Sequence, residues 1–138
     1  MSSKQFLSGT VAGGIAFFVL GYLMWGLAFM GFFEANTVGP MGMMKATPDF
    51  VTLGIGQLAF GAFLTTIFGK WATISTAQSG LKAGAMIGLL LGVAFDFTMY
   101  GTMNLYNMTA VIVDIALVTV QAALAGAVVG AVLGMTKD

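Results

Sequence analysis

The chain has 138 residues, of which 59% are hydrophobic and 7% charged, and its net charge is zero. A soluble domain carries about 25% charged residues, so this composition excludes a soluble globular protein, and no basic patch predicts binding to nucleic acid. Cysteine and histidine are absent. Their absence removes disulfides, the thiolate nucleophile, the commonest general base and the usual haem and zinc ligands. We therefore expect neither an enzyme nor a bound metal or cofactor.

Four apolar stretches are each long enough to cross a bilayer, which takes about 20 residues. We expect an all-α polytopic membrane protein in which a single domain, residues 1–138, forms a four-helix transmembrane bundle. The first stretch is too long for the apolar core of a cleaved signal peptide, so we expect it to remain as a helix. The predicted helices are residues 6–33, 50–71, 80–103 and 110–135.

The connections between these helices are rich in turn-forming and polar residues. Residues 34–49 contain two prolines and two glycines, and Asp49 suits the positive end of a following helix. Residues 72–79 are rich in serine and threonine and predict the second loop. Residues 104–109 predict the shortest connection, which makes the last two helices antiparallel neighbours.

The lysines predict which ends of the helices face the cytoplasm. Four of the five lysines fall on the side of the two termini, and only Lys45 falls on the other. By the positive-inside rule, both termini and residues 72–79 are cytoplasmic, whereas residues 34–49 and 104–109 face outward.

Small residues recur at every fourth position in the last two predicted helices. Residues four apart lie on one helix face, and small residues there let membrane helices pack closely. We expect these strips to pack the two helices together, or alternatively to join a second copy or another subunit. The strips are Gly80, Gly84, Gly88 and Gly92 in one helix and Ala122, Gly126, Gly130 and Gly134 in the other.

The same spacing brings an aspartate into each of these helices. Asp96 and Asp114 have equal predicted depth, roughly 10 Å from the turn at 1.5 Å per residue. Carboxyl groups at such depth are costly and usually face the bundle interior or water. They either hold the helices together by hydrogen bonds or bind a proton, a small cation, a ligand or a cationic group of a partner. The predicted polar layer is Asp96, Asp114, Gln57, Tyr22, Trp25, Tyr100 and Asn104.

A faint internal repeat links the two halves of the chain. Three glycines and an alanine recur at a constant offset: Gly9, Ala12, Gly13 and Gly21 match Gly80, Ala83, Gly84 and Gly92. The bundle would then consist of two related helical hairpins.

Glycine-rich and apolar segments in both halves carry a family resemblance. They are Gly13–Tyr22 and Trp25-Gly26 in the first half, and Gly80–Gly84, Asn104 and Val113-Asp114-Ile115 in the second. Together they resemble a bacterial family of small four-helix membrane proteins classified as a domain of unknown function. The run of Asp96, Tyr100, Asn104 and Val113-Asp114 is similar to a related membrane family. The resemblance implies a four-helix fold in the bacterial inner membrane, and no reaction, ligand or catalytic residue.

These features predict a protein that works by association. We expect a small accessory or structural membrane subunit, or a homo-oligomer, assembled through its small-residue faces, with the lipid bilayer and other membrane subunits as partners. One alternative is a proton- or cation-linked carrier or channel that uses the aspartate pair. Another is a binder of a lipid, quinone or pigment, with Tyr22, Trp25 and Tyr100 as the pocket wall.

Overall fold

A computed structural model describes residues 1–137, and within them the chain is an all-α bundle of four membrane-length spans. This confirms the predicted fold class. The first span comprises α1 (Ser3–Gly21), the π-helical segment η1 (Tyr22–Ala28) and the short α2 (Met30–Ala35). The second span comprises α3 (Phe50–Thr66) and the π-helical segment η2 (Ile67–Trp71).

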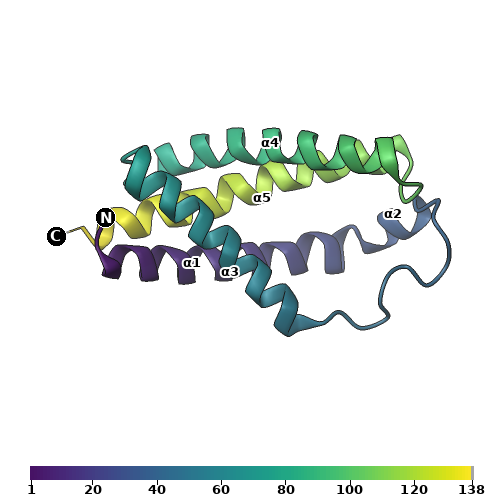
Figure 1. Cartoon of the computed structure of the whole chain (residues 1–138), viewed down its shortest axis with the longest axis horizontal. Coiled ribbons are helices and arrows are strands. Elements are labelled where there is room, and N and C mark those ends of the chain that lie inside the picture. The colour runs from purple at the N-terminus through teal and green to yellow at the C-terminus, as the bar shows by residue number, and fades with distance from the viewer. Residues whose placement is uncertain (138) are drawn as a thin grey trace.

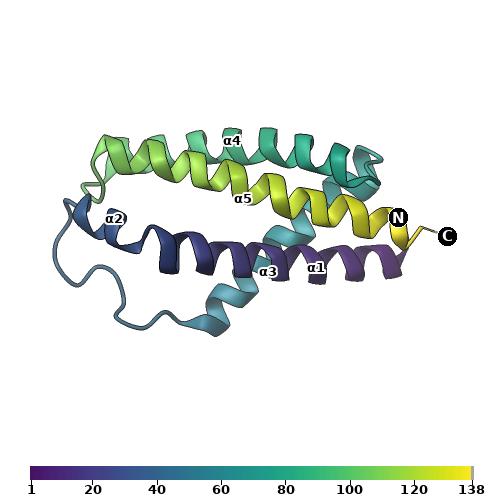
Figure 2. The ribbon, with the colours of Figure 1, turned by 180° about the vertical axis from the view of Figure 1, so that it is seen from behind.

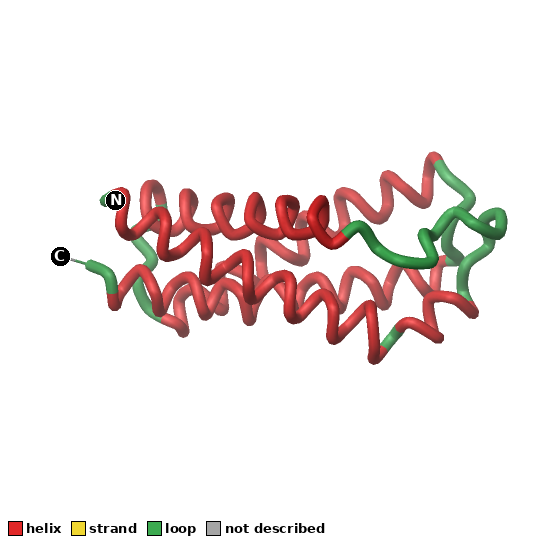
Figure 3. The backbone as a smooth tube through the Cα atoms, turned by 90° about the horizontal axis from the view of Figure 1, so that it is seen from below, coloured by secondary structure: helices red, strands yellow, loops and turns green. Residues whose placement is uncertain are grey.

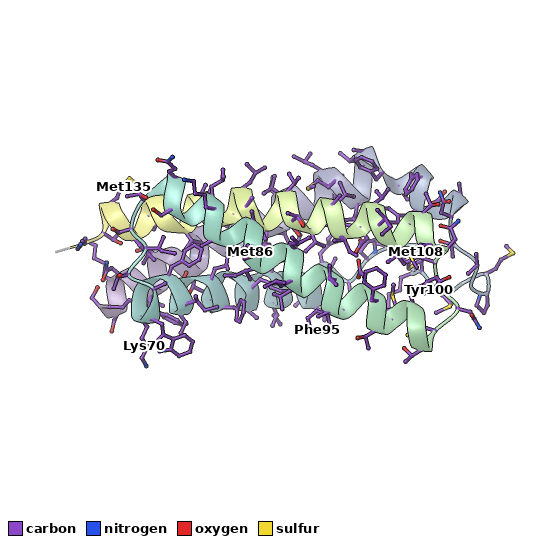
Figure 4. All side chains as sticks on the ribbon, turned by 90° about the horizontal axis from the view of Figure 1, so that it is seen from above. Lys70, Met86, Phe95, Tyr100, Met108 and Met135 are labelled. Atoms are coloured by element: carbon purple, nitrogen blue, oxygen red, sulfur yellow. The ribbon has the colours of Figure 1, made fainter. Side chains whose placement is uncertain are left out.

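The third and fourth spans are α4 (Ala77–Thr102) and α5 (Met108–Met135). Both chain termini lie at one end of the bundle, which we call the termini end (Figure 1). Residues 36–49 and 103–107 lie at the opposite, long-loop end. Figure 4 shows Lys70 and Met135 near the termini end, and Tyr100 and Met108 toward the long-loop end.

Each span begins at a polar side chain that caps its first turn. The first N–H groups of a helix have no partner within the helix, so an acceptor just before it determines where it starts. Three of the helices therefore begin two or three residues earlier than the apolar pattern predicts. The caps are Ser2, Asp49, Thr76 and Asn107, each of which accepts a backbone N–H three residues further on.

The predicted continuous helix over residues 6–33 is interrupted at Phe29, which corrects the sequence-based boundary. The backbone widens into the π-helical η1, and the N–H of Phe29 donates to the carbonyl of Met24 at 2.8 Å. Phe29 then leaves the helical conformation, with φ −113° and ψ 8°, and α2 starts after this break (Figure 3). Gly26 and Gly31 flank the interruption, and glycine weakens a helix interior.

The two small-residue strips pack α4 directly against α5. The four glycines of the α4 strip, Gly80, Gly84, Gly88 and Gly92, are all buried. A Cβ added at Gly80 would overlap the carbonyl oxygen of Gly126, and one at Gly84 would overlap that of Ala122. Gly134 packs instead against Ser75, in the connection before α4. The close contact of the two backbones holds α4 and α5 in a defined register, which sets the relative depth of their aspartates.

α5 lies between α4 and α1, and α3 crosses the bundle diagonally (Figures 1 and 2). The crossing of α3 on α1 also depends on glycine, because a Cβ at Gly61 would overlap the backbone at Thr10 and Gly14. On the termini side of this crossing, Leu64 and Phe68 are fully buried. They belong to the main core cluster, which is Phe17, Leu64, Phe68, Ala122, Ala125, Val129 and Leu133.

The glycines of the faint repeat have similar packing roles in the two halves. A Cβ at Gly9 would overlap Thr65 of α3, and one at Gly13 would lie against the Gly61 backbone. Gly80 and Gly84 contact α5 in the same manner. The relation between the two hairpins stays a prediction, because close packing on glycine also arises without common descent.

Backbone and side-chain hydrogen bonds tie the chain together at the long-loop end. The N–H of Val38 donates to the carbonyl of Leu105 at 2.7 Å. The side-chain amide of Asn107 donates to Oδ1 of Asn36 at 2.7 Å, and its backbone N–H donates to the Asn36 carbonyl at 3.1 Å. These bonds attach the end of the first span to the start of α5, and they hold Tyr106 in place between them.

Candidate functional site: a cavity beside an aspartate pair

A cavity of about 1250 Å³ lies between the spans, in the half of the bundle toward the long-loop end. Residues of α1, η1, α3, α4 and α5 line it, and the segment Met44–Phe50 contributes at its mouth. The cavity exists because α3 crosses α1 at Gly61 and then diverges from α4 toward Phe50 (Figure 1). Ligand sites in proteins usually measure about 300–1,000 Å³, so this space can accept a sizeable small molecule.

Most of the cavity wall is apolar and aromatic. Leu53 and Phe60 from α3 line one side, and Phe95 from α4 lines another. These three side chains are 43%, 44% and 68% exposed. In water, a ligand that covers exposed apolar surface stabilises the complex by about 25 cal/mol per Å². Within the membrane, van der Waals packing between the ligand and the wall contributes instead. The wall therefore suits the hydrocarbon part of a ligand.

Asp96 and Asp114 come together at one side of this cavity. Asp96 lines the cavity, and the Asp114 carboxyl on α5 lies next to it without lining the cavity itself. Each aspartate lies six residues from the connection between α4 and α5, which is about 9 Å along the helix. The contact follows from the register of the two small-residue strips.

Trp25 holds the second aspartate of the pair. Its indole N–H donates to Oδ1 of Asp114 at 2.7 Å. The residue sits in the π-helical η1, and π-helical turns re-aim side chains relative to an α-helix and are frequent at functional sites. Trp25 also packs against the cluster of Phe33, Ala110 and Leu117. Of the residues in the predicted polar layer, Trp25 is thus the one whose side chain donates a hydrogen bond to an aspartate in the described structure.

Tyr106 belongs to the site although it lies in the connection between α4 and α5 and was not among the predicted site residues. It lines the cavity, and its ring lies 5.5 Å from that of Phe33. Burial raises the pKa of Tyr106, and the nearby carboxyl groups of Asp114 and Asp96 raise it further. The tyrosine is brought there by the bonds between residues 36–38 and 105–107, and a contact between segments so far apart in sequence has no local signal.

The remaining predicted polar residues divide into two groups. Gln57 and Tyr22 line the cavity with Trp25 and Asp96. Tyr100 and Asn104 lie outside it: Tyr100 is 44% exposed on α4 (Figure 4), and Asn104 follows the end of that helix. Because α4 ends at Thr102, the four-residue spacing no longer applies to Asn104.

Gln121 forms part of the cavity floor and was not among the predicted residues. It is 8% exposed, and its side-chain amide donates to the carbonyl of Phe17 at 2.9 Å. The sequence did carry a signal, because Gln121 is a polar side chain in a mostly apolar run and lies two turns beyond Asp114 on the same helix.

Charged side chains gather at the mouth of the cavity. Glu34, Lys45 and Asp49 line it there, and all three are exposed. The hydroxyl and the backbone N–H of Thr52 donate to Asp49, at 2.7 and 3.2 Å. These bonds lower the pKa of Asp49 from its ordinary value of 3.8. The mouth is therefore anionic overall.

The fold and the site together define a multi-pass membrane protein with a cavity at membrane depth. Comparison of the chain with protein-family models, with curated proteins and with solved structures finds no match.

Proposed function

We propose that this protein binds an amphiphilic small molecule of the bilayer in the cavity beside Asp96 and Asp114. One observation supports the proposal above the others: a cavity of about 1250 Å³ whose wall is largely apolar and includes Asp96, with Asp114 next to Asp96 behind the wall. An apolar chain suits the aromatic walls on α3 and α4. A polar head suits Asp96, with Gln57 and Tyr106 also in the wall.

The divergence of α3 from α4 offers such a molecule a route from the bilayer. Phe50 and Leu53 belong to the splayed half of α3, and both are more than 40% exposed. A lipid-like ligand could move sideways between the two helices without passing through the aqueous loops. Of the alternatives that the sequence left open, this is the binder of a lipid, quinone or pigment.

A proton- or cation-linked carrier stays a second prediction, supported by the contact between Asp96 and Asp114. Transport would need a path to the other side of the membrane. In the described conformation the core cluster around Leu64, Phe68 and Val129 fills the bundle on the termini side of the cavity. A site open toward one end is better suited to binding than to conduction.

Assembly through small-residue faces also stays a prediction. The strips that suggested it contact other helices of the same chain: Gly80 and Gly84 contact α5, and Gly13 contacts α3. A homo-oligomer or a complex with another membrane subunit would therefore use other faces of the bundle.

The proposed location is the bacterial inner membrane, with both termini in the cytoplasm. The distribution of the lysines supports this orientation, and the family resemblance supports the membrane. The cavity would then open within the outer leaflet, and Lys45 and Asp49 would lie at the outer surface.

Fluorescence of Trp25 tests the proposed function directly. The chain has two tryptophans, and Trp71, which is 70% exposed, lies at the other end of the bundle. In the Trp71→Phe variant Trp25 is the sole reporter, and we expect 12-bromododecanol in nanodiscs to quench it in a saturable manner. The Trp25→Phe variant is the matched control. Its remaining reporter is Trp71, and we expect the quenching of Trp71 to rise only in proportion to the quencher concentration in the bilayer.

Two glycine substitutions on α3 separate cavity binding from lipid contact. An added Cβ meets no atom within 4 Å at either Gly54 or Gly56, but only Gly56 lines the cavity. In the Trp71→Phe background, Gly56→Phe should place an aromatic ring inside the cavity and weaken saturable quenching, whereas Gly54→Phe should leave it intact. Equal quenching in both variants would refute binding in the cavity.

A further inference from the structure

We infer that the head of the bound amphiphile is a cation, namely an ammonium group held by Asp96 beside the rings of Trp25 and Tyr106. This inference rests on the proposed function and names the class of ligand. It follows from a carboxyl oxygen beside the cavity that has no hydrogen-bond partner in residues 1–137, from the shortage of cationic side chains nearby, and from the aromatic side chains around the pair.

One oxygen of the carboxyl pair lacks a hydrogen-bond partner in the described part of the chain. Oδ2 of Asp96 is buried and, within residues 1–137, has no hydrogen-bond partner. Oδ1 of Asp114 accepts the indole N–H of Trp25. Burying an ionisable group without a partner is costly, so a ligand that supplies positive charge and N–H donors gains more here than a neutral one.

Within residues 1–137, no lysine lines the inner part of the cavity near Asp96. In the described part of the chain, Lys45 is the lysine that lines the cavity, and it lies in the loop at the mouth. Glu34 and Asp49 lie at the same mouth, so carboxyl groups outnumber lysines along the way in. Clefts lined by one sign of charge attract ligands of the opposite sign.

The side chains around the pair suit an organic cation better than a divalent metal ion. No group of three or more His, Cys, Asp and Glu side chains in residues 1–137 is placed to hold a metal. Hard divalent cations need six or more oxygen ligands, which two carboxyl groups do not supply. An ammonium group needs fewer hydrogen bonds and is attracted to the faces of Trp and Tyr rings, and Tyr22, Trp25 and Tyr106 all line this cavity.

Competition between two amphiphiles with the same tail tests the inference. The Trp71→Phe variant is placed in nanodiscs, and its Trp25 fluorescence is quenched with 12-bromododecanol. Dodecylammonium or dodecanol is then added, and the concentration of each that restores the fluorescence is measured. We expect dodecylammonium to act at a concentration at least about tenfold lower, since one tenfold step corresponds to a single charge-assisted interaction. In the same background, Asp96→Asn should abolish the preference for dodecylammonium over dodecanol, whereas Glu34→Gln should leave most of that preference in place.

The possible outcomes separate the inference from the proposed function. If dodecanol competes as well as dodecylammonium against unsubstituted Asp96, the cavity binds amphiphiles but the ammonium assignment is wrong. If the preference for dodecylammonium survives Asp96→Asn, the carboxyl pair does not hold the head and the assignment is again wrong. If 12-bromododecanol never quenches Trp25 saturably, the proposed function itself fails. Because the first comparison needs no substitution at Asp96, it holds even if Asp96→Asn does not fold.

Discussion

The indole nitrogen of Trp25 lies 2.7 Å from Oδ1 of Asp114, and this hydrogen bond connects the π-helical η1 to the start of α5. It joins residues 89 positions apart in the chain at the wall of the cavity. It orients one member of the carboxyl pair and leaves Asp96 facing the cavity. The geometry of the site therefore depends on a local irregularity in the first span as much as on the two helices that carry the aspartates.

Replacing Trp25 with phenylalanine should destabilise the protein. The Trp25→Phe variant keeps an aromatic ring but leaves Asp114 without its donor, and we expect a loss of about 1–2 kcal/mol. Thermal unfolding in mild detergent, followed by circular dichroism, measures the change. Trp71→Phe is the control, since Trp71 is largely exposed at the end of η2, and it should be within about 0.5 kcal/mol of the unsubstituted protein. An equal loss in both variants would contradict a specific role for the hydrogen bond.

A larger side chain at Gly84 should separate α4 from α5. A Cβ there would overlap the Ala122 carbonyl, and overpacking of a close contact costs about 1–3 kcal/mol or more. We expect Gly84→Leu to lower the unfolding midpoint strongly and to disturb the aspartate pair. Gly54→Ala is the matched control, because it meets no neighbour and replaces glycine in a helix interior, which should stabilise by up to about 1 kcal/mol. Tolerance of Gly84→Leu would show that the strips do not hold the two helices together.

Asn107 should matter for stability more than the nearby Asn104. Its side chain caps α5 by accepting the Ala110 N–H at 2.9 Å, and it also donates to Asn36. Asn107→Ala should cost about 1–2 kcal/mol, and it should also loosen the position of Tyr106. Asn104→Ala, an exposed site beyond the end of α4, should change stability by less than about 0.5 kcal/mol. Chemical unfolding of the two variants side by side would reveal the difference, and equal effects would contradict it.

The capping carboxylate of Asp49 should make the start of α3 sensitive to acid. Its pKa is lowered by the Thr52 hydroxyl and then by backbone N–H groups. A carboxyl whose pKa is lower in the folded protein stabilises the fold above its ordinary value of 3.8, and this contribution is lost as the pH falls through the lowered value. Asp49→Asn retains a capping oxygen but not the charge. The stability difference between the two proteins, measured by thermal unfolding from about pH 6 to about pH 2.5, should shrink at the acid end. A difference that is constant with pH would contradict this.

The sequence predicts the helices and the aspartate pair better than it predicts the cavity. Hydropathy and length identify all four spans, because crossing a bilayer needs a long apolar run. The four-residue spacing places Asp96 and Asp114 on faces that carry the glycine strips, and close backbone contact then sets their relative depth. Both kinds of prediction depend on local periodicity, which a single sequence displays.

The cavity depends on features that periodicity does not contain. The angle at which α3 crosses α1 arises from the contact at Gly61, and sequence spacing gives a helix face but not a crossing angle. The interruption at Phe29 comes from a π-helical segment with no charged or proline residue to mark it. Tyr106 reaches the site only because residues 36–38 pair with residues 105–107.

Native mass spectrometry of the gently extracted protein tests the central claim most directly. We expect the unsubstituted chain and Gly54→Phe to retain one small amphiphile per chain. We expect Gly56→Phe, which places a ring inside the cavity, to lose it. Retention of the same molecule by Gly56→Phe, or a bare mass for the unsubstituted chain in detergent and in nanodiscs, would contradict a ligand-binding cavity beside Asp96 and Asp114.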